Sequence, residues 1–443
     1  MSPDPFCFLL LQIKQSAPIS PMTVPNQVMA IILIETASLA LGQDNSTGAK
    51  ADAEAKVASP QLFDTNPQHI WNRTHAALWA KPPGEATQDR IDAMFDRLSI
   101  REGKAHDELK AILDEFNQAR EVSENMPPLQ HAVMQRDLLA GFFSAIAGSE
   151  IPEDQPLRKA WAQAIQMVAL TRDQILQLPD TYAAASAAPN AISTYDPAHP
   201  AAYLPKDLLA DNGPWLALRS KEGARTPIAR MHFHALMGLS AFEVRMRHPE
   251  GRKAGIAYLK DLEDMKNPGY NEALTPQFPA GTQWALLRRA ILADDQGRPV
   301  VSPIVESVQV RIFRDITPGG YGEIEEKQFS FEWEMPPTQL LSKFAFRSTT
   351  AADLPNSFFL QQTGVIVSPD AGSLTIHCAV CHAASGIHAI NSRELPFGSN
   401  KPNQPPVFVP TTNAEIAADA MSQASALPTW IILQRLYPSF QSK

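Results

Sequence analysis

The chain has few cysteines and no excess of basic residues, and each of these features excludes a class of protein. Only three cysteines occur in 443 residues, Cys7, Cys378 and Cys381. Because Cys7 lies in a stretch that export processing could remove, no thiols are left over for a framework of disulfides. The formal net charge is -9 at pH 7. Since nucleic-acid-binding proteins usually carry a basic patch or stripe, we expect no nucleic-acid partner.

Long hydrophobic runs are missing after the N-terminal region. A membrane-spanning helix needs about 20 consecutive apolar residues, and no run beyond the first 42 residues approaches that length. Residues 1–42 contain the apolar runs Phe6–Leu11 and Met29–Leu33 and end at Ala40-Leu41-Gly42, which offers small residues to a signal peptidase. We therefore predict an export signal over 1–42, a periplasmic or otherwise extracytoplasmic protein, and no transmembrane span in the mature chain. A disordered, partly apolar tail is the alternative.

The region 61–180 shows the periodicity of amphipathic helices. Apolar residues recur three and four positions apart, as expected when one helix face is buried. The sequence therefore predicts a helical domain over 61–180, preceded by a spacer at 43–60 that is rich in Ala, Asp, Ser, Lys and Gln. The stretches with this pattern are Ile91–Leu98, Leu109–Phe116, Leu129–Ile146 and Leu157–Leu178.

The pattern changes after residues 181–214, which lack periodicity and are expected to form a linker. A period of two, typical of half-buried strands, predicts an α+β domain over 215–367. It should hold one helix at Gly251–Met265 and antiparallel strands at Trp284–Leu292, Val308–Ile312 and Phe329–Trp333. The Gly-rich stretch Pro318–Gly322 predicts a turn between the last two strands.

The last segment, 368–443, carries the motif with the clearest chemistry. It contains Cys378-Ala379-Val380-Cys381-His382, then a proline-rich run, and then two predicted helices, Ala414–Ala424 and Thr429–Tyr437. Two cysteines separated by two residues and followed at once by histidine form the attachment pattern of c-type haem. The spacing puts both thiols about one helical turn apart, so that they can bond the two vinyl groups of one porphyrin. The adjacent imidazole then faces the iron.

This segment resembles the haem-attachment site of the c-type cytochromes, within a chain similar to long, poorly characterised bacterial proteins that carry one such motif. The resemblance implies one covalent haem c on Cys378 and Cys381, with His382 as the proximal iron ligand. It also implies attachment outside the cytoplasm and electron transfer with a redox partner protein. The expected fold is α+β: an N-terminal helical domain, a middle antiparallel region and a mostly helical, cytochrome c-like C-terminal segment.

The sixth iron ligand stays open between two residues. Met421 follows the proline-rich run and precedes the final helix, an order that resembles a compact cytochrome c domain, and a thioether ligand would raise the potential. His388 is the rival. It lies six residues past His382, so the chain would have to double back, for instance at Gly386. A five-coordinate iron would instead favour a peroxidase-like enzyme.

Other interpretations of the motif give no haem at all. Cys378, Cys381 and a histidine, either His382 or His388, could hold zinc, although a closed zinc site normally needs four ligands. A dithiol redox pair would require a βαβ surrounding that the sequence does not suggest. The cysteines could also lie in a loop without a ligand, in a binding or structural protein.

Weaker patterns elsewhere complete the set of candidate residues. His232 and His234 would share one face of an extended segment and could reach a metal, although most such histidines are ordinary core or surface residues. Arg288 and Arg289 could pair with haem propionates, but solvated strand charges are the simpler interpretation. Asp294 is expected at a turn, with Asp295.

Overall fold

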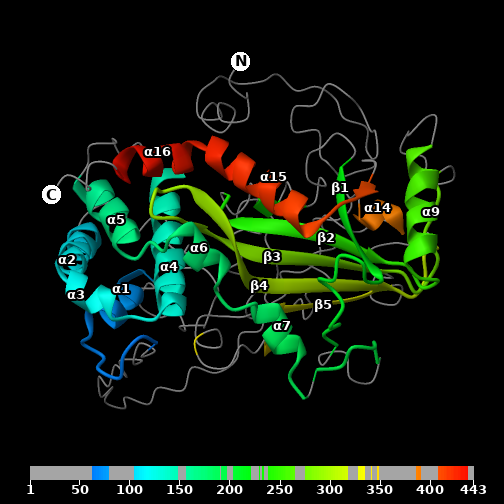
Figure 1. Ribbon diagram of the computed structural model, residues 1–443, viewed down its shortest axis with the longest axis horizontal. Coiled ribbons are helices and arrows are strands. Elements are labelled where there is room, and N and C mark those ends of the chain that lie inside the picture. The colour runs from blue at the N-terminus through cyan, green and yellow to red at the C-terminus, as the bar shows by residue number, and fades with distance from the viewer. Residues whose placement is uncertain are drawn as a thin grey trace, which may run out of the picture. The chain divides into compact units, whose positions relative to one another are not determined.

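Figure 1 shows the computed structural model of the protein, an α+β fold built on one antiparallel sheet. The predicted fold class is thus confirmed. The expected export signal and spacer lie outside the described residues, as does the helical pattern of Ile91–Leu98. The structure describes residues 62–78, 104–147, 156–189, 191–196, 203–220, 229, 232–233, 238–264, 275–317, 328–334, 341, 347–348, 386–390 and 408–437.

The sheet has seven strands in the order β6-β5-β4-β3-β2-β1-β7, and each neighbouring pair runs antiparallel. The order from β1 to β6 follows the chain, so these strands form a simple meander. The last strand, β7, comes from the C-terminal segment and pairs with β1 at the opposite edge from β6. The strands are β1 (Trp215–Ser220), β2 (Ser240–Arg247), β3 (Gln283–Ala293), β4 (Pro299–Phe313), β5 (Gln328–Glu334), β6 (Arg347–Ser348) and β7 (Phe408–Pro410).

The three strands predicted from the period of two are confirmed as parts of β3, β4 and β5. The turn between β3 and β4 contains Gly297 with φ +74°, a conformation that glycine adopts without strain. Asp294 fixes this turn, because its carboxylate accepts hydrogen bonds from the backbone N–H groups of Gln296 (2.9 Å) and Arg298 (2.8 Å). The predicted turn at Pro318–Gly322 lies outside the described residues.

The helices predicted within the described residues are found, with one correction. The pattern of Leu157–Leu178 is not one helix, because Thr171 starts a second helix with a capping box that it shares with Gln174. A short helix, α7, also occurs within the expected linker. The helices are α1 (Ile70–Leu78), α2 (Lys104–Gln118), α3 (Arg120–Glu124), α4 (Pro128–Ala147), α5 (Pro156–Met167), α6 (Arg172–Leu176), α7 (Thr181–Ser186), α9 (Arg252–Glu263), α14 (Ile387–Ile390), α15 (Asn413–Ala426) and α16 (Pro428–Leu436). None of the described helices is long and apolar enough to cross a membrane.

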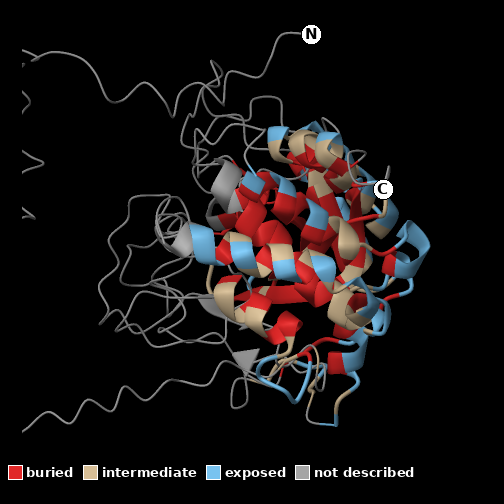
Figure 2. Ribbon diagram, turned by 90° about the vertical axis from the view of Figure 1, so that its left-hand side faces the viewer, coloured by how far each residue is buried: buried red, intermediate tan, exposed pale blue. Residues whose placement is uncertain are grey.

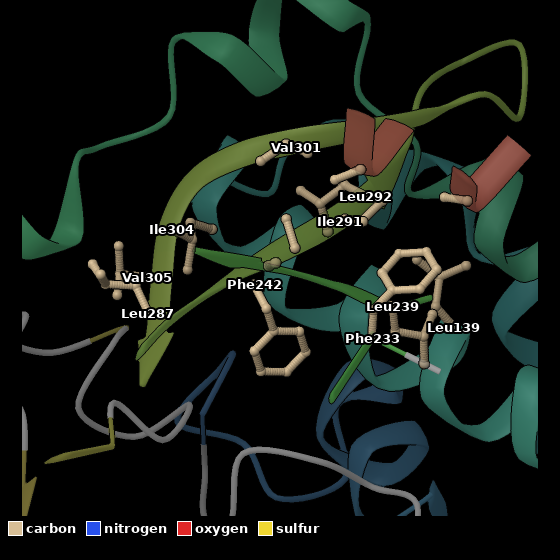
Figure 3. Packing of buried hydrophobic residues seen from close by; sticks show 14 of the residues in the cluster. Leu139, Phe233, Leu239, Phe242, Leu287, Ile291, Leu292, Val301, Ile304 and Val305 are labelled. Atoms are coloured by element: carbon tan, nitrogen blue, oxygen red, sulfur yellow. The ribbon is translucent and has the colours of Figure 1, made fainter. Parts of the chain in front are cut away.

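The described helices and strands share one buried core (red in Figure 2). Figure 3 shows part of it, where Leu139 of α4 lies close to Phe233 and Leu239 and to Ile291 of β3. All described residues fall in one compact unit, which comprises 58–396 and 401–443. The division into a helical domain, a linker, an α+β domain and a haem segment therefore stays a prediction.

The C-terminal helices complete this core. Trp430 of α16 is fully buried, and its ring packs edge-on against Phe143 of α4 at a centroid distance of 5.1 Å. The indole Nε1 of Trp430 donates a 3.1 Å hydrogen bond to the backbone oxygen of Gly238, just before β2. Because α16 contacts α4, α5 and the residue Gly238 before β2, this last described helix packs as an integral part of the fold.

A β-bulge in β4 turns Glu306 into the core. Arg288 pairs with Ser307 and Arg289 with Val305, so Glu306 is the extra residue between them. Its carboxylate lies 2.5 Å from Arg136 Nε of α4 and 2.9 Å from Arg288 Nε. Since all three side chains are at most one-tenth exposed, this ion-pair cluster joins α4 to the sheet in a dry environment.

Replacing Glu306 by Ala should lower the free energy of unfolding by about 3–5 kcal/mol, because it removes the carboxylate that two buried guanidinium groups share. Urea denaturation at neutral pH measures the change. Glu124→Ala is the matched control. Glu124 pairs with Arg120 on the surface, where the side chains are 66% and 82% exposed, so its loss should cost about 0.5 kcal/mol or less. Equal losses in the two variants would contradict the stabilising role of the buried cluster.

Candidate functional site

The cysteine motif lies in the connection between β6 and β7, residues 349–407. This connection joins the two opposite edges of the sheet, since β6 and β7 are its outermost strands. Cys378, Cys381 and His382 lie outside the described residues. The described segments that follow the motif are α14, β7, α15 and α16.

Helix α14 begins five residues after His382 and is fixed to the body of the protein. The backbone N–H of Ile387 donates a 2.9 Å hydrogen bond to the side-chain oxygen Oε1 of Gln277, which precedes β3. Ile387 and Ile390 are both buried. Gly386 adopts φ +53°, and a Cβ at this position would overlap the Gln277 amide. Glycine is thus required where the chain enters α14, at the residue where a change of direction was expected.

Gln277 borders a group of five buried aromatic side chains, which we call the aromatic corner. The Phe278 ring lies 4.9 Å from Phe313, 5.8 Å from Trp284 and 6.1 Å from Tyr258, measured between ring centroids. Trp284 in turn lies 5.7 Å from Phe408 of β7. Such tilted and edge-on contacts are favourable geometries for aromatic pairs.

The aromatic corner is where the chain returns after the motif. Helix α14 is bonded to Gln277, and β7 brings Phe408 onto Trp284. Figure 1 shows α14 beside α9, the helix that carries Tyr258. Both described segments that follow the motif before α15 are therefore fixed at this corner.

Met421, one of the two predicted distal ligands, lies on α15 and is partly buried. Its sulfur is 3.9 Å from Nη1 of Arg172, at the start of α6. That start is tied to the β3–β4 turn by a bridge between Leu170 and Asp294. Gln277 lies before the other end of β3, a strand of eleven residues that spans roughly 33 Å. The structure thus places the Met421 thioether and α14 toward opposite ends of β3.

The rival ligand and the histidine pair are only partly described. His388 belongs to α14, although its side chain lies outside the described residues. The His232 ring packs against Phe242 of β2 at 5.3 Å, and His234 lies outside the described residues. Within the described part of the chain, no three His, Cys, Asp or Glu side chains gather as metal ligands would.

The interpretation of Arg288 and Arg289 as solvated strand charges is wrong. Both guanidinium groups are largely buried in ion pairs, Arg288 with Glu306 and Arg289 with Glu243. Because successive side chains of a strand leave opposite faces of the sheet, the two arginines serve separate clusters. The sequence alone could not identify these partners, because neither glutamate is near either arginine in the chain.

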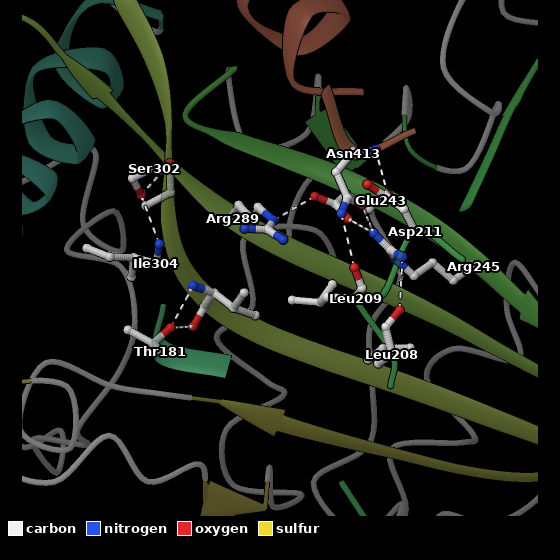
Figure 4. A network of polar contacts seen from close by, with 12 residues as sticks. Thr181, Leu208, Leu209, Asp211, Glu243, Arg245, Arg289, Ser302, Ile304 and Asn413 are labelled. Atoms are coloured by element: carbon white, nitrogen blue, oxygen red, sulfur yellow. Dashed lines mark hydrogen bonds and ion pairs between the residues drawn. The ribbon is translucent and has the colours of Figure 1, made fainter. Parts of the chain in front are cut away.

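Glu243 of β2 is the centre of the second cluster (Figure 4). It accepts hydrogen bonds from Arg245 Nη2 (2.8 Å) and Arg289 Nε (2.6 Å). Arg245 also donates to the backbone oxygen of Leu208 and to Asn413 Oδ1, at the start of α15. Burial would raise the pKa of Glu243, but the charges of Arg289 and Arg245 outweigh it and lower that pKa. A charged cluster thus fixes the chain three residues after β7.

A buried histidine–aspartate pair joins two helices, and no pattern in the sequence predicts it. His75 of α1 lies with Nδ1 2.6 Å from Asp137 Oδ2 of α4, 62 positions away in the chain. Both side chains are almost completely buried. The pair holds α1 to α4, and we assign it no chemistry.

Comparisons with protein-family models, with curated proteins and with solved structures found no match.

Replacing Arg289 by Gln should destabilise the protein at neutral pH and much less in acid. The lowered pKa of Glu243 favours the folded state above the ordinary glutamate pKa of about 4.3. This contribution disappears as the pH falls through the folded-state pKa. Arg289 is the main cation that lowers the pKa, so the variant should lose stability mainly above about pH 4.3.

Urea denaturation across the pH range measures this difference. The control Arg120→Gln removes an exposed cation and should change stability little at any pH. An Arg289→Gln deficit that is the same at pH 7 and in acid would show that Glu243 is not the group involved.

Proposed function

We propose that the protein is an extracytoplasmic c-type cytochrome with one haem, which transfers electrons to or from a redox partner protein. The observation that carries the proposal is the sequence Cys378-Ala379-Val380-Cys381-His382. It uses every cysteine of the chain except Cys7 and has the order of groups that covalent haem attachment requires. Bound haem would supply one-electron chemistry at iron.

The residues present fit such a group. Two thiols and an imidazole within five residues match the attachment chemistry, and the chain that follows is fixed at the aromatic corner by Gln277. Gly386 lies four residues after His382, and four residues span at most about 14 Å. The proposed haem therefore belongs near the end of the sheet where β3 begins. The aromatic corner lies at the same end of the sheet and forms the buried core beside it.

The arrangement favours His388 over Met421 as the sixth ligand. Met421 faces Arg172 near the far end of β3, whereas His388 belongs to α14, which is bonded to Gln277. A second imidazole would also give a lower potential than a thioether. We therefore expect a bis-histidine iron, with Met421 as the less suited candidate.

Expression in a host with c-type cytochrome maturation should give a red protein whose haem stays attached on a denaturing gel. Cys378→Ser together with Cys381→Ser should abolish the attachment, since no vinyl group can then be bonded. Cys7→Ser is the matched control and should keep the haem. A colourless protein that binds zinc would overturn the proposal in favour of a non-haem protein.

The ferric spectrum tests the ligand assignment in the haem-loaded protein. His388→Ala should convert a low-spin iron to a high-spin iron, because one strong-field ligand is lost. Met421→Ala should leave the spectrum unchanged. The reverse pattern would identify Met421 as the ligand. A high-spin iron in the wild type would mean an open site, and would point to a peroxidase-like haem enzyme.

A further inference from the structure

His131, in the first turn of α4, presents both of its ring nitrogens to backbone carbonyl oxygens. Its Nε2 lies 2.9 Å from the oxygen of Ser123 in α3, and its Nδ1 lies 3.1 Å from the oxygen of Val168, just after α5. A carbonyl oxygen can only accept a hydrogen bond. Because a neutral imidazole has one N–H donor and one lone pair, only the charged imidazolium can donate to both oxygens.

The His131 ring is held in this position by a third element. The Trp71 ring of α1 packs edge-on against it, with a centroid distance of 5.2 Å and an interplanar angle of 76°. Trp71, Ser123 and Val168 are all buried. Ser123 also contacts the end of α5 directly, since its Oγ donates a 3.4 Å hydrogen bond to the backbone oxygen of Met167. The ring therefore lies at a packed junction of α1, α3, α4 and α5.

Backbone groups, and not ionised side chains, face this ring. Within the described part of the chain, no charged side chain forms an ion pair or a hydrogen bond with His131. The titratable side chains of the surrounding elements are directed elsewhere: Arg73 pairs with Glu115, His75 with Asp137 and Arg136 with Glu306, whereas Arg120, Glu121, Glu124, Lys159, Arg172 and Asp173 are exposed, and Arg158 lies at the opposite end of α5 from Val168.

The helix dipoles at the junction act on a charged ring in opposite directions. His131 lies near the N-terminal end of α4, where the dipole disfavours a cation, whereas Val168 follows the C-terminal end of α5, where the dipole favours one. Since these effects oppose each other, the direct hydrogen bonds decide. A bond from a charged donor is about twice as strong as one from a neutral donor.

Two other described histidines have the opposite arrangement. The Nδ1 atom of His69 accepts a 3.3 Å hydrogen bond from the backbone N–H of Trp71, and the Nδ1 atom of His248 accepts one of 3.2 Å from the backbone N–H of Glu250. A nitrogen that accepts must keep its lone pair, so a second proton on either ring would break this bond. His131 differs because both of its nitrogens face acceptors.

We propose that His131 is a pH-dependent clamp that joins α3, α4 and the end of α5. In its charged form the ring donates to Ser123 and Val168 at once. When one proton leaves, the nitrogen that loses it presents a lone pair to a carbonyl oxygen, so one of the two hydrogen bonds becomes a repulsive contact. The clamp involves no cofactor and is independent of the function proposed above.

Replacing His131 by Gln tests the clamp, because the amide carries its donors on one nitrogen and cannot donate in both directions at any pH. A charge that forms preferentially in the folded chain stabilises it fully below the ordinary histidine pKa of about 6.5, and this stabilisation disappears as the pH rises. In urea denaturation of the full chain, the variant should therefore have a lower midpoint than the wild type, with a larger deficit at about pH 6 than at about pH 8.5.

His248→Gln is the matched control. His248 is also largely buried, at 6% exposed, but its Nδ1 is an acceptor. Its midpoint deficit should not grow as the pH falls, since a second proton would break the hydrogen bond from Glu250. The same pH dependence in both variants would overturn the clamp, as would a His131→Gln deficit that is constant or larger in base.

A second measurement serves if His131→Gln does not fold. NMR of the wild-type protein with ¹⁵N-labelled histidine follows the protonation of each ring nitrogen, and the contact with Trp71 identifies the His131 ring. His131 should lose its second ring proton at a higher pH than His248 does. Loss at the same or a lower pH would overturn the clamp and would leave the proposed function intact.

Discussion

The pairing of β7 with β1 is the constraint on which the candidate site depends. It places residues that follow the motif at one edge of the sheet, whereas β6, which precedes it, forms the other edge. Three further contacts fix the returning chain: Gln277 with Ile387, Arg245 with Asn413, and Gly238 with Trp430. The described segments that follow the motif are thereby fixed to the body of the protein.

Two buried clusters support this arrangement from opposite faces of the sheet. Glu306 joins α4 to the sheet. Glu243 links the sheet to the start of α15 through Arg245. Each cluster contains one carboxylate and two guanidinium groups, so both depend on exact pairing to offset the cost of burial. The same pairing leaves Arg288 and Arg289 poorly suited to bind a cofactor.

The sequence predicted those elements whose signal is local. The strands within β3 and β4 and the two C-terminal helices have regular apolar spacing. The cysteine motif is recognised from the type and spacing of only five consecutive residues. Strand β2 was not predicted, although Phe242, Val244 and Met246 alternate with charged residues in the same period of two. Its burial on both faces had no local signal, because it depends on contacts such as that of Glu243 with Arg289, which lies far away in the chain. Strand β7 has only three residues and ends at Pro410, so it offers no period to detect. The break between α5 and α6 depends on side-chain capping by Thr171, which apolar periodicity does not register.

Intact-mass spectrometry of the protein purified from the extracytoplasmic fraction of a maturation-competent host tests the central claim most directly. The account predicts a mature chain heavier than its polypeptide by the mass of one haem, with the added mass on the peptide that contains Cys378 and Cys381. A chain of unmodified mass with two free thiols at these positions would contradict it.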